Sequence, residues 1–253
     1  MTLRSCLALF AVALLPLAGQ ADLLTYSQDF NSMNTADSGL GPTDLSDDGW
    51  KVGAVVFDPG GNYLYDYFTF PAPNGGPGFS AVATGDGGTN QAPNYMNVYN
   101  DYNNADHASG NYIDAFVFQE QFIGTADLGT TASLTFDYLK NPSVGNGFGD
   151  TTTFAFVKVL DLVGGSFATL GINEFETTNA STTTWAEGQS ISLAIDSAWD
   201  GQLLQFGFRS YATNYNDSGI FYDNLNFSSV PEPSSALIFG LGCVGFGLRR
   251  RRK

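Results

Sequence analysis

Short runs of alternating apolar and polar residues fill most of the chain between residues 22 and 229, separated by stretches rich in glycine, asparagine, aspartate and threonine. In the clearest run, Ile113, Ala115 and Val117 fall on one face of a strand, and Phe116 and Phe118 fall on the other. Similar runs cover residues 134–139, 154–160, 190–195, 203–211 and 220–227. No stretch has a helical period long enough for a crossover helix. The pattern predicts one all-β domain over residues 22–229, folded as an antiparallel β-sandwich.

The first 21 residues have a different pattern, with Arg4 ahead of an apolar stretch from Leu7 to Leu17. A small-x-small sequence, Gly19-Gln20-Ala21, follows the stretch. This order is typical of a secretory signal peptide with its cleavage site. We therefore expect residues 1–21 to be removed and the body to be exported.

The last 24 residues, 230–253, combine three features in a fixed order. Pro231, Glu232 and Pro233 are followed by an apolar, glycine-rich segment over residues 234–248. The end is basic: Arg249, Arg250, Arg251, Arg252 and Lys253. The prolines prevent a helix or a central strand from running through, and the basic cluster would stop translocation at the cytoplasmic side.

This order resembles the PEP-CTERM sorting signal of Gram-negative bacteria that produce exopolysaccharide. The resemblance implies processing by a membrane-embedded exosortase, with residues 234–248 in the membrane as a transient intermediate. The segment is about 22 Å long as a helix, shorter than the roughly 30 Å of hydrocarbon in a bilayer. The protein would then reach the outer surface or the extracellular space. A plain tail anchor remains the alternative.

The charge and the cysteine content of the body limit the bonds it can form and the partners it can bind. The two cysteines, Cys6 and Cys243, lie in the terminal segments, so the body can form no disulfide. Residues 22–229 contain 24 acidic and four basic residues, a net charge of about −20. Because nucleic-acid affinity depends on lysine and arginine contacts to phosphates, nucleic acid is excluded as a partner.

The order of motifs along the body narrows the fold. It runs from Gln28-Asp29-Phe30-Asn31 through Gly49-Trp50 and Phe118–Phe122 to Ile220–Leu225. This succession resembles galactose-binding-like jelly rolls, the fold of many carbohydrate-binding modules. In those modules the first and last strands often hold a structural calcium ion. The resemblance implies Asn31 and Asp223 as the calcium ligands here.

Asp223 is also a candidate metal ligand because it is a charged residue within an apolar run. Strand alternation predicts that it shares a face with Phe221, Leu225 and Phe227. A carboxylate on an apolar face needs a metal, a cation or hydrogen bonds. Two interpretations stay open, a calcium ligand and an aspartate at a strand bend bonded to backbone amides.

Tyrosines suggest where a sugar could bind, because a tyrosine ring can stack on a sugar while its hydroxyl reaches a polar group. Tyr63, Tyr65 and Tyr67 alternate, which predicts one packed face of a strand. Tyr99 and Tyr102 lie in or beside a polar loop and are our candidates for ligand binding.

These observations predict a surface-sorted, noncatalytic protein associated with extracellular polysaccharide or biofilm matrix. No G-x-S-x-G or H-E-x-x-H signature is present, and no catalytic residue is assigned. The acidic body predicts neutral or metal-bridged glycans as ligands. The alternatives are a secreted glycan or ester hydrolase, and a purely structural matrix component.

Overall fold

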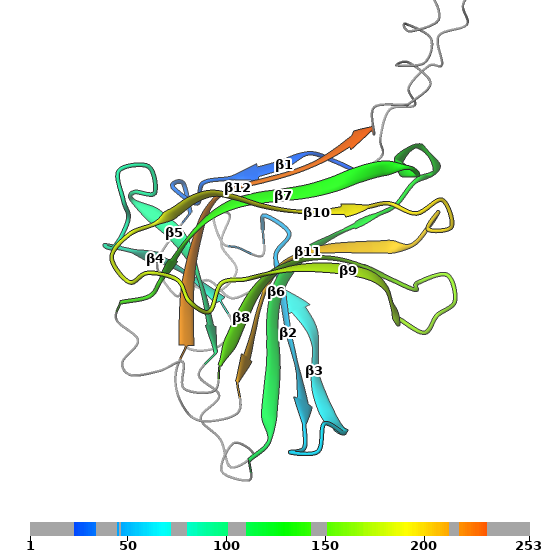
Figure 1. Ribbon diagram of the computed structural model, residues 1–253, viewed down its shortest axis with the longest axis horizontal. Helices are drawn as coiled ribbons and strands as arrows, with labels where there is room; N and C mark the ends of the chain where they lie inside the picture. The colour runs from blue at the N-terminus through cyan, green and yellow to red at the C-terminus, as the bar shows by residue number, and fades with distance from the viewer. Residues whose placement is uncertain are drawn as a thin grey trace, which may run out of the picture.

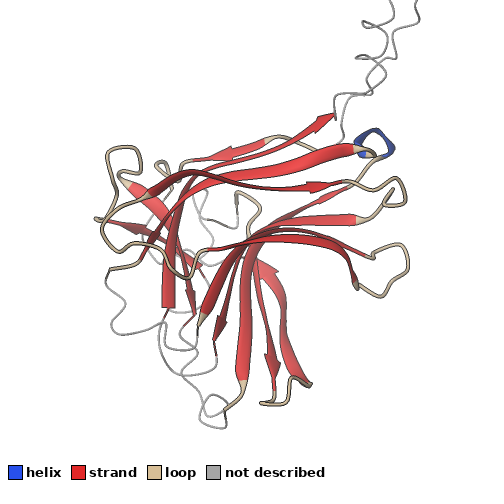
Figure 2. Cartoon of the chain, viewed as in Figure 1, coloured by secondary structure: helices blue, strands red, loops and turns tan. Residues whose placement is uncertain are grey.

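The computed structural model describes residues 23–33, 45, 47–71, 80–100, 110–142, 151–212 and 218–231, and these ranges are built almost entirely of strands (Figures 1 and 2). The strands are β1 (Tyr26–Gln28), β2 (Lys51–Phe57), β3 (Tyr63–Pro71), β4 (Ser80–Thr84), β5 (Asn94–Asn100), β6 (Tyr112–Phe122), β7 (Thr130–Lys140), β8 (Thr152–Leu160), β9 (Thr169–Glu176), β10 (Ala186–Ala194), β11 (Leu203–Ala212) and β12 (Ser218–Pro231). A 3-10 helix, η1 (Thr125–Asp127), precedes β7.

The strands form two sheets, which we call sheet A and sheet B. Sheet A has the order β10-β7-β12-β5-β4, with β1 also paired to β12, and sheet B has the order β3-β2-β6-β11-β8-β9. The strand pairs of both sheets are antiparallel. The first and last strands meet in sheet A, where Tyr26 lies opposite Phe227. The predicted antiparallel β-sandwich is confirmed.

Aromatic rings from both sheets meet in the core. Phe208 of β11 stacks on Tyr222 of β12 with ring centroids 3.6 Å apart, and Phe206 stacks on Phe227 at 4.1 Å. All four side chains are buried. The Tyr222 hydroxyl shares a hydrogen bond of 2.7 Å with the Thr177 hydroxyl, so its polar end is satisfied inside the core. These contacts join the two sheets into one body.

The alternation predicted for residues 112–122 is confirmed in β6. Ile113, Ala115 and Val117 are all buried, Val117 in the main core and the other two in a smaller apolar cluster of sheet B. Phe116 points the other way and lines a cavity on the opposite face of sheet B. The period of two therefore places aromatic rings outside the core as well as inside it.

A bulge changes the prediction made for the tyrosines of β3. Val56 lies opposite Tyr65, whereas Phe57 lies opposite Tyr63, so one residue of β3 between them is unpaired. Tyr65 packs against the buried apolar cluster that contains Val56, and Tyr63 faces outward. The prediction that these two tyrosines share a face is wrong. The side chain of Tyr67 lies outside the described residues.

The last strand ends within the proline motif. β12 continues to Pro231, which lies opposite Thr130 at the start of β7. A proline fits the end of a strand because it needs no backbone donor there. The signal peptide 1–21, Glu232, Pro233, the apolar segment 234–248 and the basic cluster lie outside the described residues. Among the residues that are described, no helix is long and apolar enough to cross a membrane.

Candidate ligand-binding cleft

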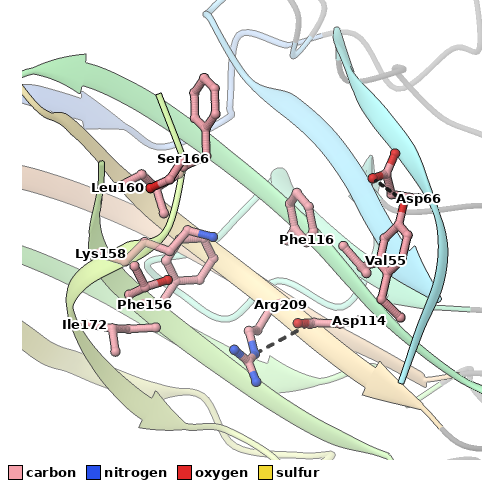
Figure 3. A pocket seen from close by; sticks show the side chains of 13 residues that line it. Val55, Asp66, Asp114, Phe116, Phe156, Lys158, Leu160, Ser166, Ile172 and Arg209 are labelled. Atoms are coloured by element: carbon pink, nitrogen blue, oxygen red, sulfur yellow. Dashed lines mark hydrogen bonds and ion pairs between the residues drawn. The ribbon is translucent and has the colours of Figure 1, made fainter. Parts of the chain in front are cut away.

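The face of sheet B that is turned away from sheet A, its outer face, is hollowed into a cavity of about 640 Å³ (Figure 3). Side chains from β2, β3, β6, β8, β9 and β11 line it, together with the turn between β8 and β9. This volume lies within the range typical of small-molecule sites, about 300–1,000 Å³. We call this cavity the outer cleft.

A glycine keeps the middle of this face flat. Gly207 of β11 pairs with Phe118 on one side and Phe156 on the other. A Cβ atom at Gly207 would lie 2.2 Å from the Val117 carbonyl oxygen and 2.7 Å from the Phe118 Cα. Real Cβ atoms do not approach so closely, so the close packing of β11 against β6 requires glycine here. This face of the sheet therefore carries the Phe118 and Phe156 rings on either side of β11 with no side chain at Gly207 between them.

Two exposed aromatic rings belong to the cleft lining. Tyr63 of β3 is 60% exposed, and Phe167, in the turn between β8 and β9, is 56% exposed. The Tyr63 hydroxyl donates to Asp66 Oδ2 at 2.9 Å. The Phe167 amide donates to the Asp161 carbonyl at 2.9 Å, and the Ser166 hydroxyl donates to Asp161 Oδ2 at 2.8 Å. A side-chain hydrogen bond thus holds Tyr63 and turn hydrogen bonds hold the backbone at Phe167, while both rings stay more than half exposed.

Arg209 organises the charges along one side of the cleft. Its Nη1 lies 2.9 Å from Glu174 Oε1, and its Nε lies 3.5 Å from Asp114 Oδ1. The guanidinium also lies over the Phe154 ring, 5.1 Å from the centroid. Burial raises the pKa of the Asp114 carboxyl, and the positive charges of Arg209 and Lys158 oppose that rise. Both carboxylates are therefore engaged by one cation.

Lys158 of β8 lies in the same cleft lining as Arg209 and Asp114, but it forms no ion pair with a described carboxylate. Its ammonium is 4.8 Å from the centroid of Phe156 and 5.2 Å from that of Phe116. Figure 3 shows the nitrogen directed toward Phe116. In the described ranges, Lys158 forms no ion pair. Burial lowers the pKa of this lysine.

The described lining of the cleft does not include the tyrosines chosen from the sequence, Tyr99 and Tyr102. Tyr99 belongs to β5 of sheet A, whereas the cleft lies on sheet B. The side chain of Tyr99 and the whole of Tyr102 lie outside the described residues, so ligand binding there stays a prediction. In the sequence, the alternation of residues 112–122 pointed to this cleft, because it placed Phe116 on the face of the strand opposite the core side chains.

The surroundings of Asp223 differ from the prediction. Asn224 has a φ of 51°, and the pairing of β12 with β7 slips around it, which is a bulge. Leu225 and Phe227 join the main core, but Phe221 belongs to a separate cluster on the other face of sheet A. The prediction that Asp223 shares one face with all three residues is wrong, because the bulge interrupts the period of two.

The Asp223 carboxylate is nevertheless buried and only partly satisfied. Its Oδ1 accepts a hydrogen bond from the Asn224 amide at 2.7 Å, whereas its Oδ2 has no hydrogen-bond partner among the described residues. Burial raises the pKa of this carboxyl to about 7. The Asn224 hydrogen bond opposes that rise, and the negative charges of Asp29 and Asp137 add to it. One oxygen thus matches a strand-bend aspartate, and the other is available to a cation.

Asn31, the other predicted calcium ligand, lies at the same end of sheet A. Its Oδ1 accepts from the Asn94 amide at 3.3 Å. Two residues after Asn94, Met96 pairs with Tyr222, the neighbour of Asp223. Within the described ranges, no group of three or more acidic, histidine or cysteine side chains is arranged to hold a metal. A calcium ion here would need carbonyl and amide oxygens besides the Asp223 carboxylate.

Comparison with known proteins identifies the C-terminal segment. Residues 229–252 match the PEP-CTERM protein-sorting motif, so the predicted sorting signal around Pro231, Glu232 and Pro233 is confirmed. The motif indicates an exported protein that is sorted at a membrane. No curated protein matches the sequence of the chain.

Solved structures similar to the chain include several carbohydrate-binding modules. One is the CBM22-1 xylan-binding domain of Xyn10C from Paenibacillus barcinonensis, with 10% identity, a TM-score of 0.39, and coverage of 84% of this chain and 96% of that one. Another is the C-terminal family 22 module of Xyn10B from Clostridium thermocellum, with 12% identity, a TM-score of 0.35, and coverage of 82% and 92%. A third is TmCBM61 in complex with β-1,4-galactotriose, with 12% identity, a TM-score of 0.34, and coverage of 59% and 81%. All three TM-scores are below 0.5, so these similarities do not indicate which ligand this chain binds.

Proposed function

We propose that this protein is an exported, noncatalytic polysaccharide-binding protein whose ligand site is the outer cleft of sheet B. The observation that carries the proposal is the pair of exposed rings, Tyr63 and Phe167, in a cavity that also contains hydrogen-bonding groups. Exposed aromatic rings in a concave site favour ligand binding over packing within the chain.

The chemistry of the cleft suits a sugar chain. A sugar ring has C–H groups on its faces, which stack on aromatic rings, and hydroxyl groups at its edge, which need hydrogen-bond partners. Asp66 and Arg209 supply such partners from opposite parts of the lining, as Figure 3 shows. The arrangement therefore offers both contacts that a carbohydrate requires.

Binding is favoured over hydrolysis by the state of the carboxylates. A glycosidase needs two carboxyl groups free to act as an acid and as a base or nucleophile. Of the two carboxylates that line the outer cleft, Asp114 lies beside Arg209 and Asp66 accepts a hydrogen bond from the Tyr63 hydroxyl. Turnover of any glycan by the purified protein would overturn the noncatalytic assignment and favour the hydrolase alternative.

Alanine at Tyr63 or Phe167 is expected to weaken glycan binding. Removing one stacking ring should cost about 1–2 kcal/mol, which lowers affinity about 5- to 30-fold. Calorimetry with oligosaccharides of the host's own polysaccharide measures this loss. Phe122→Ala is the matched control, because Phe122 is 65% exposed but does not line the cleft. Unchanged affinity in both cleft variants would refute the site.

A structural calcium ion is a second proposal, supported by the Asp223 Oδ2 that lacks a partner among the described residues. Asp223 would supply the carboxylate and Asn31 an amide or carbonyl oxygen. A bound cation would stabilise the end of sheet A where β5 and β12 meet and would have no part in any reaction. Its effect on stability is developed in the Discussion.

The sorting signal supports a route for the protein. We propose that an exosortase processes the segment 230–253, that residues 234–248 enter the membrane only transiently, and that the body reaches the cell surface or the surrounding matrix. Polysaccharide binding at the outer cleft would then attach the body to the matrix or biofilm. A purely structural role remains the alternative if no glycan binds.

A further inference from the structure

The few positive charges of the body are gathered on one face. Residues 22–229 contain only four basic residues against 24 acidic ones. Lys51, Lys158 and Arg209 all lie on the outer face of sheet B, because each alternates with a buried core residue in its strand. The fourth, Lys140, belongs to β7 of sheet A. The same face also carries acidic side chains, namely Asp66, Asp114, Glu120 and Glu174, so the cations there differ in whether a carboxylate pairs with them.

Two of these three cations already have counter-ions within the chain. Arg209 pairs with Glu174 and Asp114, as described above. Lys51 forms an ion pair with Glu120. Their charges are therefore largely neutralised by the protein itself.

Lys158 is the exception, although acidic residues lie near it. Glu120 is in the same row across the sheet, since it pairs with Gln205, which pairs with Lys158. Glu120 nevertheless turns to Lys51 and also accepts from Gln205 Nε2 at 3.1 Å. Glu120 is thus paired with another cation. Asp114 lies 3.5 Å from Arg209 Nε, and its Oδ1 has no hydrogen-bond partner among the described residues. The Lys158 ammonium contacts the two phenylalanine rings.

We infer that the outer cleft binds an acidic sugar, a residue whose carboxylate pairs with the Lys158 ammonium. The inference rests on the proposed function and adds the class of sugar. The Lys158 ammonium is mostly buried and forms no ion pair with a described residue, although the charge of Asp114 acts on it. Such a group gains from direct pairing with an anionic ligand. The lowered pKa of Lys158 agrees with this, since a bound carboxylate would reverse the cost of burial.

This class differs from the neutral glycans that the sequence predicts. The sequence predicts neutral or metal-bridged glycans from the net charge of the whole body. Lys158 is the cation of the cleft lining that forms no ion pair among the described residues, so the carboxylate of an acidic sugar can pair with it at short range. Because charge pairing is screened by salt, acidic ligands should bind more weakly as the salt concentration rises, and neutral ligands should not.

The test compares acidic oligosaccharides with their carboxyl-reduced, neutral counterparts. The probes are oligomers of mannuronate, guluronate, galacturonate and glucuronoxylan, and affinity is measured by calorimetry at low and high salt. At least one acidic oligomer should bind about 10- to 100-fold more tightly than its reduced form. Lys158→Met should abolish that preference and leave the affinity for the reduced form within a few-fold.

Lys140→Met is the matched control, because it removes the same charge from sheet A and should leave the preference intact. Circular dichroism confirms that each variant is folded. If the reduced oligomers bind as tightly as every acidic one, or if Lys140→Met lowers the preference as much as Lys158→Met, the inference is wrong. Binding of neutral oligomers that depends on Tyr63 and Phe167 would then leave the proposed function standing. Absence of binding by both kinds of oligomer would refute both proposals.

Discussion

Asp223→Asn is expected to raise the free energy of unfolding at pH 8 by about 4 kcal/mol in calcium-free buffer. The folded protein holds the pKa of this carboxyl at about 7, against 3.8 for the ordinary group. The unfolded chain therefore loses this proton near pH 4, whereas the folded chain keeps it until about pH 7. Each unit of difference corresponds to about 1.4 kcal/mol, so stability is lost as pH rises between these values.

Asparagine has no proton to lose and is not repelled by Asp29 and Asp137. The two proteins should therefore be equally stable near pH 4 and should diverge up to pH 8. Urea unfolding across this range measures the difference. A constant difference at all pH values would show that the Asp223 carboxylate ionises freely in the folded protein.

Calcium should narrow the difference between the two proteins if it binds at Asp223. At pH 8 the ion would stabilise the native protein, by about 2.7 kcal/mol at a hundredfold excess over its dissociation constant. Acid would then remove this gain, because protons and calcium compete for the same carboxylate. Asp223→Asn should show no calcium response. A native protein with the same unfolding curve in calcium and in chelator would favour the strand-bend interpretation.

Asp58→Asn provides a control of opposite sign. Asp58 accepts hydrogen bonds from the Gly60 and Asn62 amides, each at 2.8 Å, and hydrogen bonding to the Asn62 side chain and backbone lowers its pKa. Its stabilising effect is present above the ordinary pKa and is lost as pH falls. The Asp58→Asn variant should therefore be less stable than the native protein at neutral pH, and the difference should shrink in acid.

Glu232→Gln is expected to stop release of the protein from the inner membrane. Glu232 stands between two prolines in the sequence, and its carboxylate is the one charge in residues 230–233. If an exosortase reads that charge, full-length precursor should accumulate in the inner membrane and surface protein should fall to near zero. Fractionation with mass spectrometry measures both amounts.

Glu176→Gln makes the same change in an exposed residue of β9 and should leave sorting unaffected. Native protein recovered from the surface should lack residues 249–253. Recovery of surface-exposed native protein with an intact C-terminus would contradict processing and would support the plain tail anchor.

The alternation of side chains allowed the sandwich to be predicted from the sequence. In β6, the contrast between Ile113 and Phe116 identified the strand and its two faces correctly, because a strand has a fixed period of two. The sorting signal was equally readable, because its three parts are contiguous in the chain. Both features depend on neighbours in sequence.

The parts that the sequence did not predict depend on neighbours in space. The bulge next to Phe57 moves Tyr63 to the opposite face of its sheet, and the bulge at Asn224 does the same to Leu225. No local residue pattern predicts either bulge. The outer cleft combines Tyr63 with Phe167, which lie 104 positions apart in the sequence and on different parts of sheet B. Whether Lys158 has a counter-ion is decided by the pairing of three strands, which only the register of the sheet reveals.

Mapping of amide chemical shifts during titration with oligosaccharides of the host's own polysaccharide tests the central claim most directly. If the outer cleft is the ligand site, the shifts should gather around Tyr63, Phe116, Lys158 and Phe167, and strands β4, β5, β7 and β10 of sheet A should be unaffected. Shifts confined to sheet A, or no shifts with any fraction of that polysaccharide, would contradict the assignment of the outer cleft as a glycan-binding site.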